Sequence, residues 1–201
     1  TIIALDGKPM GLRTPTQRRE HGMCFVPEER LGHGAIADMS LWENTILSAR
    51  NKKGMLRYGF LDNTRAASFA KEIIKVFNVK TSSVDHAARS LSGGNVQKFI
   101  VGREILQSPH VLVISQPTWG VDAGAAADIH ASLQELAQNG TAVLVISQDL
   151  DELMAISTRF AVIANGCLSK PKPTGEMSVE EIGLLMGAVQ PAKNHGGALN
   201  A

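Results

Sequence analysis

Short apolar runs alternate along this chain with longer stretches in which apolar residues recur at helical spacing. The runs at residues 23–26, 111–114 and 143–146 are short and largely apolar, and each is expected to be a strand. Because the last two are apolar at every position, we expect both to be buried in a parallel sheet. The alternation of strands with helices predicts an α/β fold with a mainly parallel sheet.

Several stretches carry the start signal or the apolar stripe of a helix. Ser40 and Glu43 form a capping-box pattern, which predicts a helix over residues 40–48. Residues 65–77 carry an apolar stripe that we expect to lie in the core, and its members are Phe69, Ile73, Ile74 and Phe77. Further helices are expected at 16–21, 123–137 and 178–186, a strand or hairpin at 1–7, a hairpin at 160–166, a basic loop at 52–61 and a flexible tail at 190–201.

The composition of the chain limits the kinds of partner that we expect it to bind. The 201 residues suffice for one core with a small appended lobe. Lys and Arg total 20 against 19 Asp and Glu, for a formal charge of +1, so no strongly basic field indicates nucleic acid. Cys24 and Cys167 are far apart in the sequence and are expected to be buried, reduced thiols. No apolar run approaches the length that spans a bilayer, so we expect any membrane role to come through a partner.

A turn of small residues opens the helix that precedes the second apolar run. Ser92, Gly93 and Gly94 stand at its start, followed by Asn95. The glycines let the backbone turn sharply, and the first N–H groups of a helix have no partner within it. Together with the positive end of the helix dipole, these N–H groups favour an anion such as a phosphate. The alternative interpretation is a glycine-capped surface helix beside an ordinary core strand.

With the segment that follows it, this helix resembles the signature region of the ATPase domains of ATP-binding cassette (ABC) transporters. Residues 91–97 match the signature motif, with Asn95 in place of the usual glutamine. Residues 111–116 fall where the family's Walker B strand lies, and residues 120–122 where its D-loop lies. The resemblance covers residue 1 to about residue 186, and it implies an ABC-type, P-loop NTPase-like fold with an inserted helical subdomain.

The loop after the first apolar run adds to this likeness. Residues 27–30 read Pro-Glu-Glu-Arg at the place of the family's Q-loop, a form that resembles the second ATPase domain of sugar and nucleoside importers. Glu28 would then occupy the place of the glutamine that senses the metal and the membrane partner, although these four residues alone describe an exposed charged turn. The resemblance implies a partial catalytic core at 1–39, a helical subdomain at 40–90, and the signature helix, Walker B strand, D-loop and C-terminal core at 91–189.

Three departures from the family indicate that this chain is not an autonomous ATPase. The P-loop pattern Gly-x-x-x-x-Gly-Lys-Ser/Thr does not occur in the sequence, and because the family places it before the Q-loop, we expect the N-terminal part of a domain to be missing. Ser115 and Gln116 stand where the family has an aspartate and its catalytic glutamate, and Gln148 stands at the switch histidine. A glutamine cannot take a proton from water, so we expect no ATP hydrolysis by this chain alone. Ser115 would touch Mg²⁺ only through water.

The resemblance implies that the intact signature acts on a nucleotide held by another domain. ABC ATPase domains pair head to tail, so Ser92, Gly93, Gly94 and Asn95 would bind ATP, with its Mg²⁺, at a composite site, and Asp122 would help to couple the two sites. We expect a degenerate second ATPase domain of an importer for nucleosides or simple sugars, at the cytoplasmic face of the cell membrane. Its expected partners are an ATPase domain N-terminal in the same full-length chain, transmembrane permease subunits and, indirectly, an extracytoplasmic solute-binding protein, with no nucleic acid.

Two other functions are left open by the sequence. One is a truncated, non-catalytic interaction subunit that binds membrane subunits without nucleotide. The other is a soluble ABC ATPase that works on DNA or ribosomes, for which a coiled-coil insertion or basic surfaces would be expected and neither is visible.

Overall fold

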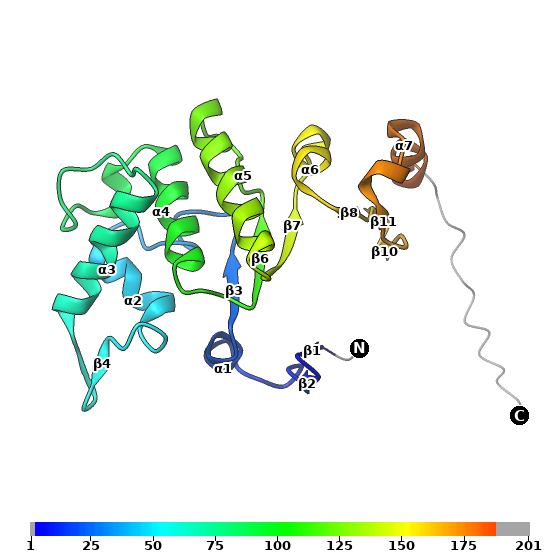
Figure 1. Ribbon diagram of the computed structural model, residues 1–201. Coiled ribbons are helices and arrows are strands. Elements are labelled where there is room, and N and C mark those ends of the chain that lie inside the picture. Colours follow the sequence, from blue (N-terminus) through cyan, green and yellow to red (C-terminus); the bar gives the residue numbers. More distant parts are fainter. Residues whose placement is uncertain (1–2, 188–201) are drawn as a thin grey trace, which may run out of the picture. The chain divides into compact units, whose positions relative to one another are not determined.

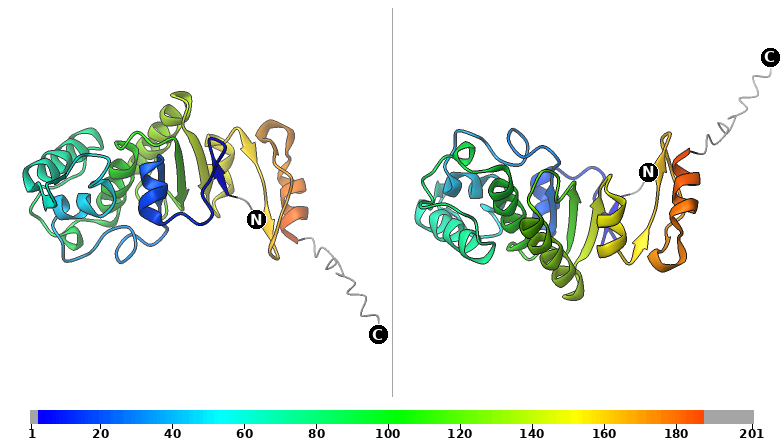
Figure 2. Two further views of the ribbon diagram at one scale, coloured as in Figure 1. Left: turned by 90° about the horizontal axis from the view of Figure 1, so that it is seen from below. Right: turned by 90° about the horizontal axis from the view of Figure 1, so that it is seen from above.

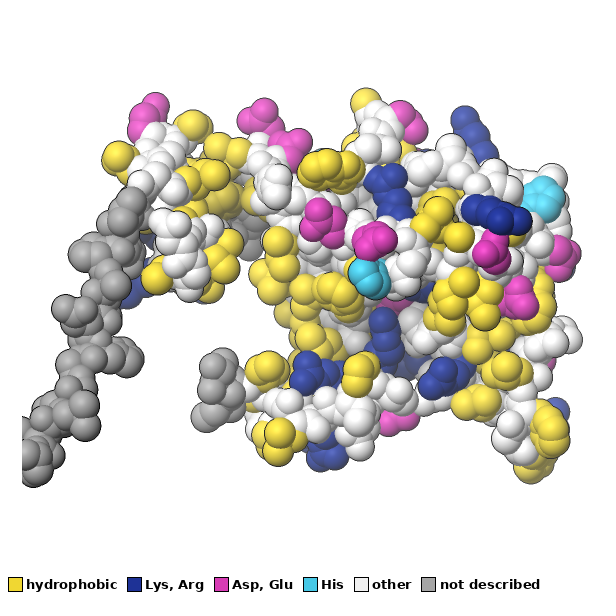
Figure 3. Space-filling view, turned by 180° about the vertical axis from the view of Figure 1, so that it is seen from behind, with side chains coloured by type: hydrophobic (Ala, Val, Ile, Leu, Met, Phe, Trp, Pro, Cys, Tyr) yellow, Lys and Arg dark blue, Asp and Glu magenta, His cyan; other side chains and the backbone are white. Residues whose placement is uncertain are grey.

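The computed structural model describes residues 3–187, which form two compact units that divide between Gln148 and Asp149 (Figure 1). Each unit is described by itself. No helix in the described part of the chain is long and apolar enough to cross a bilayer. Acidic and basic side chains are interspersed over the face of the first unit drawn in Figure 3, as expected from the near-neutral formal charge of +1.

A parallel sheet lies at the centre of the first unit, with strand order β3-β6-β7. Its strands are β3 (Met23–Val26), β6 (Val111–Ser115) and β7 (Ala142–Ile146), so all three expected strands form. In its register Val26 pairs with Ile114 and Ile114 with Val145, which brings the ends of the strands to one edge of the sheet. Leu112 and Ile114 of the middle strand are fully buried.

Residues 143–146 form the expected strand, but the expectation that this strand is buried is wrong. Leu144 is 56% exposed and Ile146 is 47% exposed, while Val143 and Val145 are half-buried. The physical reason is that alternate side chains of a strand point to opposite faces of the sheet, so burial depends on what covers each face. Helix α5 (Ala123–Gln138) packs against β7, so only one of the two faces of this strand is covered by that helix.

Three helices pack together next to the sheet: α2 (Leu41–Ala49), α3 (Asn63–Val76) and α4 (Gly93–Ile105) (Figures 1 and 2). Helix α2 begins at Ser40 with the expected capping box, in which Ser40 Oγ accepts from the Glu43 N–H and the Glu43 carboxylate accepts from the Ser40 N–H. The expected apolar stripe of α3 is confirmed as core, because Phe69 and Ile73 are buried.

A small hairpin replaces the loop that was expected at residues 52–61. It consists of β4 (Leu56–Arg57) and β5 (Phe60–Leu61). Its turn residues Tyr58 and Gly59 both have positive φ, at 50° and 85°, which is the backbone of a two-residue hairpin turn. Tyrosine rarely adopts this conformation, so of the two turn residues only Gly59 is of a type that indicates a hairpin turn in the sequence.

The remaining elements of the first unit frame the sheet. The hairpin of β1 (Ala4–Leu5) and β2 (Lys8–Pro9) leads into α1 (Pro15–Glu20), which has a capping box at Thr14 and packs against β3. A short 3₁₀ helix, η1 (Ala88–Ser90), precedes α4.

The second unit is small and has its own core. Its elements are α6 (Leu150–Ile156), β8 (Arg159–Phe160), β9 (Ile163–Ala164), β10 (Cys167–Leu168), β11 (Lys172–Pro173), η2 (Thr174–Glu176) and α7 (Val179–Gly187). Phe160, Val162, Met177 and Ile182 form the core. Cys24 of the first unit is a buried free thiol as expected, but Cys167 is exposed on a short hairpin, so the prediction for that cysteine is wrong. The tail expected at 190–201 lies outside the described residues.

Candidate functional site

The start of helix α4 presents polar groups to solvent. Ser92 is its N-cap residue, in extended conformation with φ −63° and ψ 154°, and its side chain accepts no hydrogen bond from a backbone N–H of the first turn. Ser92 and Gly93 are exposed. A helix of 13 residues with an uncapped start retains the partial positive charge of its dipole there. We call Ser92, Gly93 and Gly94 the signature start.

Asn95 binds groups of its own chain. Its side-chain oxygen accepts from the Lys80 N–H at 2.7 Å, and its Nδ2 donates to Ser92 Oγ at 2.8 Å. Both ends of the amide are therefore engaged, and the bond to Ser92 fixes the position of that hydroxyl. The expected contact of Asn95 with a nucleotide remains a prediction. In the structure, Asn95 supports Ser92 through this hydrogen bond.

Asp122 lies beside the signature start. It is the N-cap of α5, where its carboxylate accepts from the Ala125 N–H at 3.0 Å, and this bond lowers the pKa of Asp122. A Cβ placed on Gly94 would lie 3.6 Å from Asp122 Oδ2. The turn before α5, residues 117–122, thus comes next to the signature start, and we call it the D-loop-like turn.

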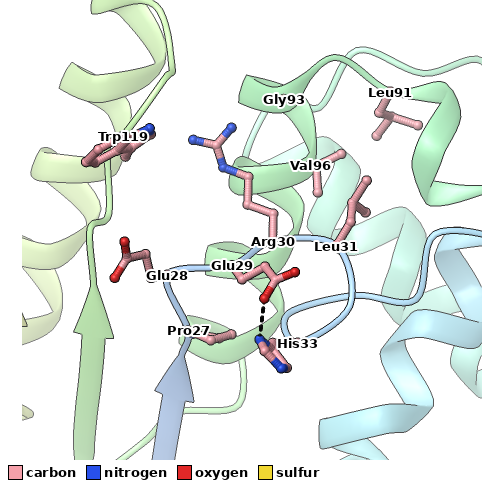
Figure 4. Close-up of a pocket in the computed structure, with 10 residues that line it drawn as sticks. All are labelled: Pro27, Glu28, Glu29, Arg30, Leu31, His33, Leu91, Gly93, Val96 and Trp119. Atoms are coloured by element: carbon pink, nitrogen blue, oxygen red, sulfur yellow. Dashed lines mark ion pairs between the residues drawn. The ribbon is translucent and has the colours of Figure 1, made fainter.

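An open cavity of about 830 Å³ lies beside these two segments (Figure 4). It is lined by the loop that follows β3, including Glu28 and Arg30, by Gly93 and Val96 of α4, and by Trp119 of the D-loop-like turn. Glu28, expected at the Q-loop position, is exposed at this cavity. The structure therefore gathers the Q-loop-like, signature and D-loop-like segments around one space.

The end of strand β6 is built differently. Gln116 is buried and has a positive φ of 49°, which is strained for a residue with a side chain. Its N–H donates to the Ile146 carbonyl at 2.7 Å, and its side-chain oxygen accepts from Ser147 Oγ at 3.4 Å. Gln148, expected at the switch position, follows Ser147 in the turn after β7 and is exposed.

The residues at this strand end do not fit a magnesium ion. Ser115 and Gln116 offer a hydroxyl and an amide, both neutral, whereas Mg²⁺ in proteins is held through carboxylates and phosphates. Within residues 3–187, no group of three or more His, Cys, Asp or Glu side chains is arranged to hold a metal ion. We therefore assign no chemical step to a metal bound by Ser115.

Sequence reasoning missed a buried polar cluster at the far end of α4, the Glu104 cluster of Arg19, Ser48, Arg103 and Glu104. The Glu104 carboxylate is fully buried and accepts from Arg19 Nη1 at 2.6 Å, Ser48 Oγ at 2.6 Å and Arg103 Nε at 2.9 Å. Burial alone would raise the pKa of Glu104, but the charges of Arg103 and Arg19 and the hydrogen bond from Ser48 outweigh it, so this pKa lies below its ordinary value.

Arg103 extends this cluster toward the loop after β3. Its Nη1 donates to the Asn44 carbonyl at 2.9 Å and its Nη2 to the Gly34 carbonyl at 2.8 Å. The helix that begins at the signature is therefore anchored to α1, to α2 and to the loop that bears Glu28. The signal in the sequence was an Arg-Glu pair placed among apolar positions of a helix, but its partners could not be read from spacing.

Gln97 makes another link that the sequence did not indicate. Its Nε2 donates to the Pro117 carbonyl at 2.8 Å, which ties α4 to the start of the D-loop-like turn. Its side-chain oxygen is buried with no hydrogen-bond partner within the described chain.

Comparison with known proteins shows what the chain as a whole is similar to. The chain is 39% identical over 184 residues to the nucleoside import ATP-binding protein NupA of Lactococcus lactis, a match that covers 92% of this chain and 36% of NupA. It is 38% identical over 184 residues to the guanosine import ATP-binding protein NupO of Bacillus subtilis, and 36% identical over 180 residues to the ribose import ATP-binding protein RbsA of Shouchella clausii. These matches cover 92% and 90% of this chain and 36% of each relative, so the chain spans about a third of their length. A scan against protein-family models finds no match.

Solved structures agree on the fold. The dimeric ATP-binding cassette MJ0796 in a post-hydrolysis state with ADP and Pi has a TM-score of 0.70 and 21% identity, over 85% of this chain and 72% of that one. The ATP-binding cassette MJ1267 has a TM-score of 0.64 and 20% identity, over 90% of this chain and 71% of that one. The chain is therefore homologous to a segment of the sugar and nucleoside import ATP-binding proteins, and its fold is that of an ABC ATPase cassette.

Proposed function

We propose that this chain acts as the degenerate second ATPase domain of an ABC importer for nucleosides or simple sugars, at the cytoplasmic face of the membrane. It would supply its signature start in trans to a nucleotide held by a partner ATPase domain. Its other partners would be the permease subunits and, through them, an extracytoplasmic solute-binding protein. The relatives named above carry out import of nucleosides and ribose, as their names state.

The observation that carries this proposal is the contrast between two sites on one chain. The signature start has exposed donors and an uncapped helix dipole, which suits an anionic phosphate that arrives from outside. The strand end offers Ser115 and Gln116, with no carboxylate to accept a proton or hold a cation. A chain of this kind is suited to complete another domain's site.

Each residue of the signature start would have a definite task. Ser92 would direct its hydroxyl at the phosphate, held in place by the hydrogen bond from Asn95. Gly93 and Gly94 would offer backbone N–H groups at close range, since they carry no side chain to keep a phosphate away. Asp122, next to Gly94, would transmit the state of one site to the other. ATP would supply the reactive phosphoryl group.

A chimera tests this function. This chain would replace the segment that it matches in NupA, and ATP hydrolysis and nucleoside uptake would be measured in membranes that contain the permease. We expect Ser92→Arg, which fills the signature start, to cut turnover by roughly 100-fold, the scale of losing a donor to a reacting oxygen. Ser82→Arg, an exposed serine on the loop before η1, is the matched control and should leave turnover unchanged. Normal turnover in Ser92→Arg would contradict the role of the signature.

A further inference from the structure

The side chain of Arg30 reaches from the loop after β3 to two other segments. A Cβ placed on Gly93 would lie 2.7 Å from Arg30 Nη1, and one placed on Gly120 would lie 3.5 Å from Arg30 Nη2. Figure 4 shows the guanidinium extending to Gly93 and toward the segment that carries Trp119. One guanidinium therefore lies close to both Gly93 of the signature start and Gly120 of the D-loop-like turn.

Arg30 is half-buried at the cavity and has no charged partner there among the described residues. Within residues 3–187 its nitrogens make no hydrogen bond or ion pair, although two glutamates precede it in the sequence. Glu29 pairs instead with His33, at 2.7 Å between Oε2 and Nδ1, and Glu28 is exposed. Partial burial without a counter-charge lowers the pKa of Arg30. A planar, weakly hydrated guanidinium is suited to lie flat against backbone in this way, whereas an ammonium is not.

Of the two glycines beside Arg30, only Gly93 leaves room that a side chain would take from the guanidinium, since a Cβ on Gly120 would be at an ordinary contact distance of 3.5 Å. At Gly93 an added methyl group would fall inside van der Waals contact with Arg30 Nη1. At Gly94, one residue further along the helix, the nearest atoms to an added methyl group would belong to Asp122 and Val121, at ordinary contact distances of 3.6 to 3.9 Å. A methyl group at Gly93 would therefore displace the Arg30 guanidinium from its position in the unliganded protein, whereas one at Gly94 would not.

We propose that Arg30 is a positioning residue that holds the signature start and the D-loop-like turn together by packing its guanidinium on Gly93 and Gly120. A shift of the loop after β3 would then move both segments at once. This inference concerns the protein without nucleotide, and it stands or falls independently of the proposed function.

Amide resonances of the ¹⁵N-labelled chain test the proposal by a double-mutant cycle. Arg30→Ala should shift the resonances of both Gly93 and Gly120, which lie in different segments. Gly93→Ala should shift Gly120 when Arg30 is present, because the new methyl group displaces the guanidinium. In the Arg30→Ala background the same Gly93→Ala change should leave Gly120 unmoved, since the coupling of two mutations vanishes when the shared partner is gone.

Two variants control for other causes. Gly94→Ala has ordinary contacts and should act on Gly120 equally with and without Arg30. Arg30→Lys keeps the charge and most of the stem but lacks the planar group, so it should shift Gly120 as Arg30→Ala does, and it serves in its place if that variant does not fold. The proposal is overturned if Arg30→Ala moves neither glycine, if Gly93→Ala moves Gly120 equally in both backgrounds, or if Arg30→Lys restores the wild-type resonances.

Discussion

Helix α4 begins with hydrogen-bond donors that are exposed to solvent and ends near a pair of charged residues that are buried. At its start, Ser92 and Gly93 are exposed and no side chain caps the first turn. Near its end, Arg103 and Glu104 are buried and hydrogen-bonded to α1, to α2 and to the loop after β3. Both ends are helical, but the start is exposed to solvent and the end is buried. The difference teaches that the start of α4 is accessible to a ligand, while the end of the helix is fixed by its contacts within the fold.

Removal of one carboxylate should have the largest effect on stability. Glu104→Ala leaves the charges of Arg19 and Arg103 buried without their partner, and breaking a buried ion pair from one side costs about 3–5 kcal/mol of unfolding free energy. Ser92→Ala, the matched change at the other end, should alter this free energy by less than about 0.5 kcal/mol, as is usual for exposed positions. Urea unfolding followed by circular dichroism measures both. Equal costs at the two ends would break the comparison.

Acid should weaken the buried end of α4. Because the pKa of Glu104 in the folded protein lies below its ordinary value of 4.5, its ionised form stabilises the fold at every pH above that value. This contribution is lost as the pH falls from 4.5 through the lower folded pKa. Glu104→Gln cannot ionise, so the unfolding free energy of this variant should fall less steeply than that of the wild type over this range. Parallel curves for the two proteins would mean that Glu104 is not held as described.

The reactivity of the Cys24 thiol, which lies near Glu104, tests the buried end of α4 with a smaller and more local expected effect. Burial, together with the nearby negative charge of Glu104, raises the pKa of Cys24 to about 12, so its thiol should resist a thiolate-specific reagent at pH 8. The exposed Cys167 should react. We therefore expect one of the two thiols to be modified in the native protein and both to be modified after denaturation. Glu104→Ala should speed the modification of Cys24, and Ser92→Ala should leave its rate unchanged. Fast reaction of Cys24 in the wild type would contradict its burial.

The sequence predicted those parts of the molecule that depend on neighbours along the chain. The strands at 23–26 and 111–114, the capping box at Ser40 and the small-residue start of α4 all follow from local pattern. The exposure of Leu144 was not predictable, because an apolar strand has the same sequence whether or not its second face is covered.

Contacts between distant residues were also beyond the sequence. Arg19 and Glu104 are separated by 85 positions, and no periodicity relates them. Arg30 was noted as part of a charged turn, but its contacts with Gly93 and Gly120 depend on how three segments fold together. Gln116 has a positive φ, and its N–H donates to the Ile146 carbonyl on the next strand, a contact that no local propensity indicates.

The most direct measurement of the central claim is ATP hydrolysis by the NupA chimera with Ser92→Arg and with Gln116→Ala, compared in one assay. Substrate and permease are the same in both, and the changes lie at the two sites that the proposal contrasts. We expect Ser92→Arg to lose roughly 100-fold in turnover and Gln116→Ala to retain it, because under the proposal only the signature start would contact the nucleotide of the partner domain. Loss of turnover in Gln116→Ala with normal turnover in Ser92→Arg would place the catalytic role at the strand end and contradict the proposal.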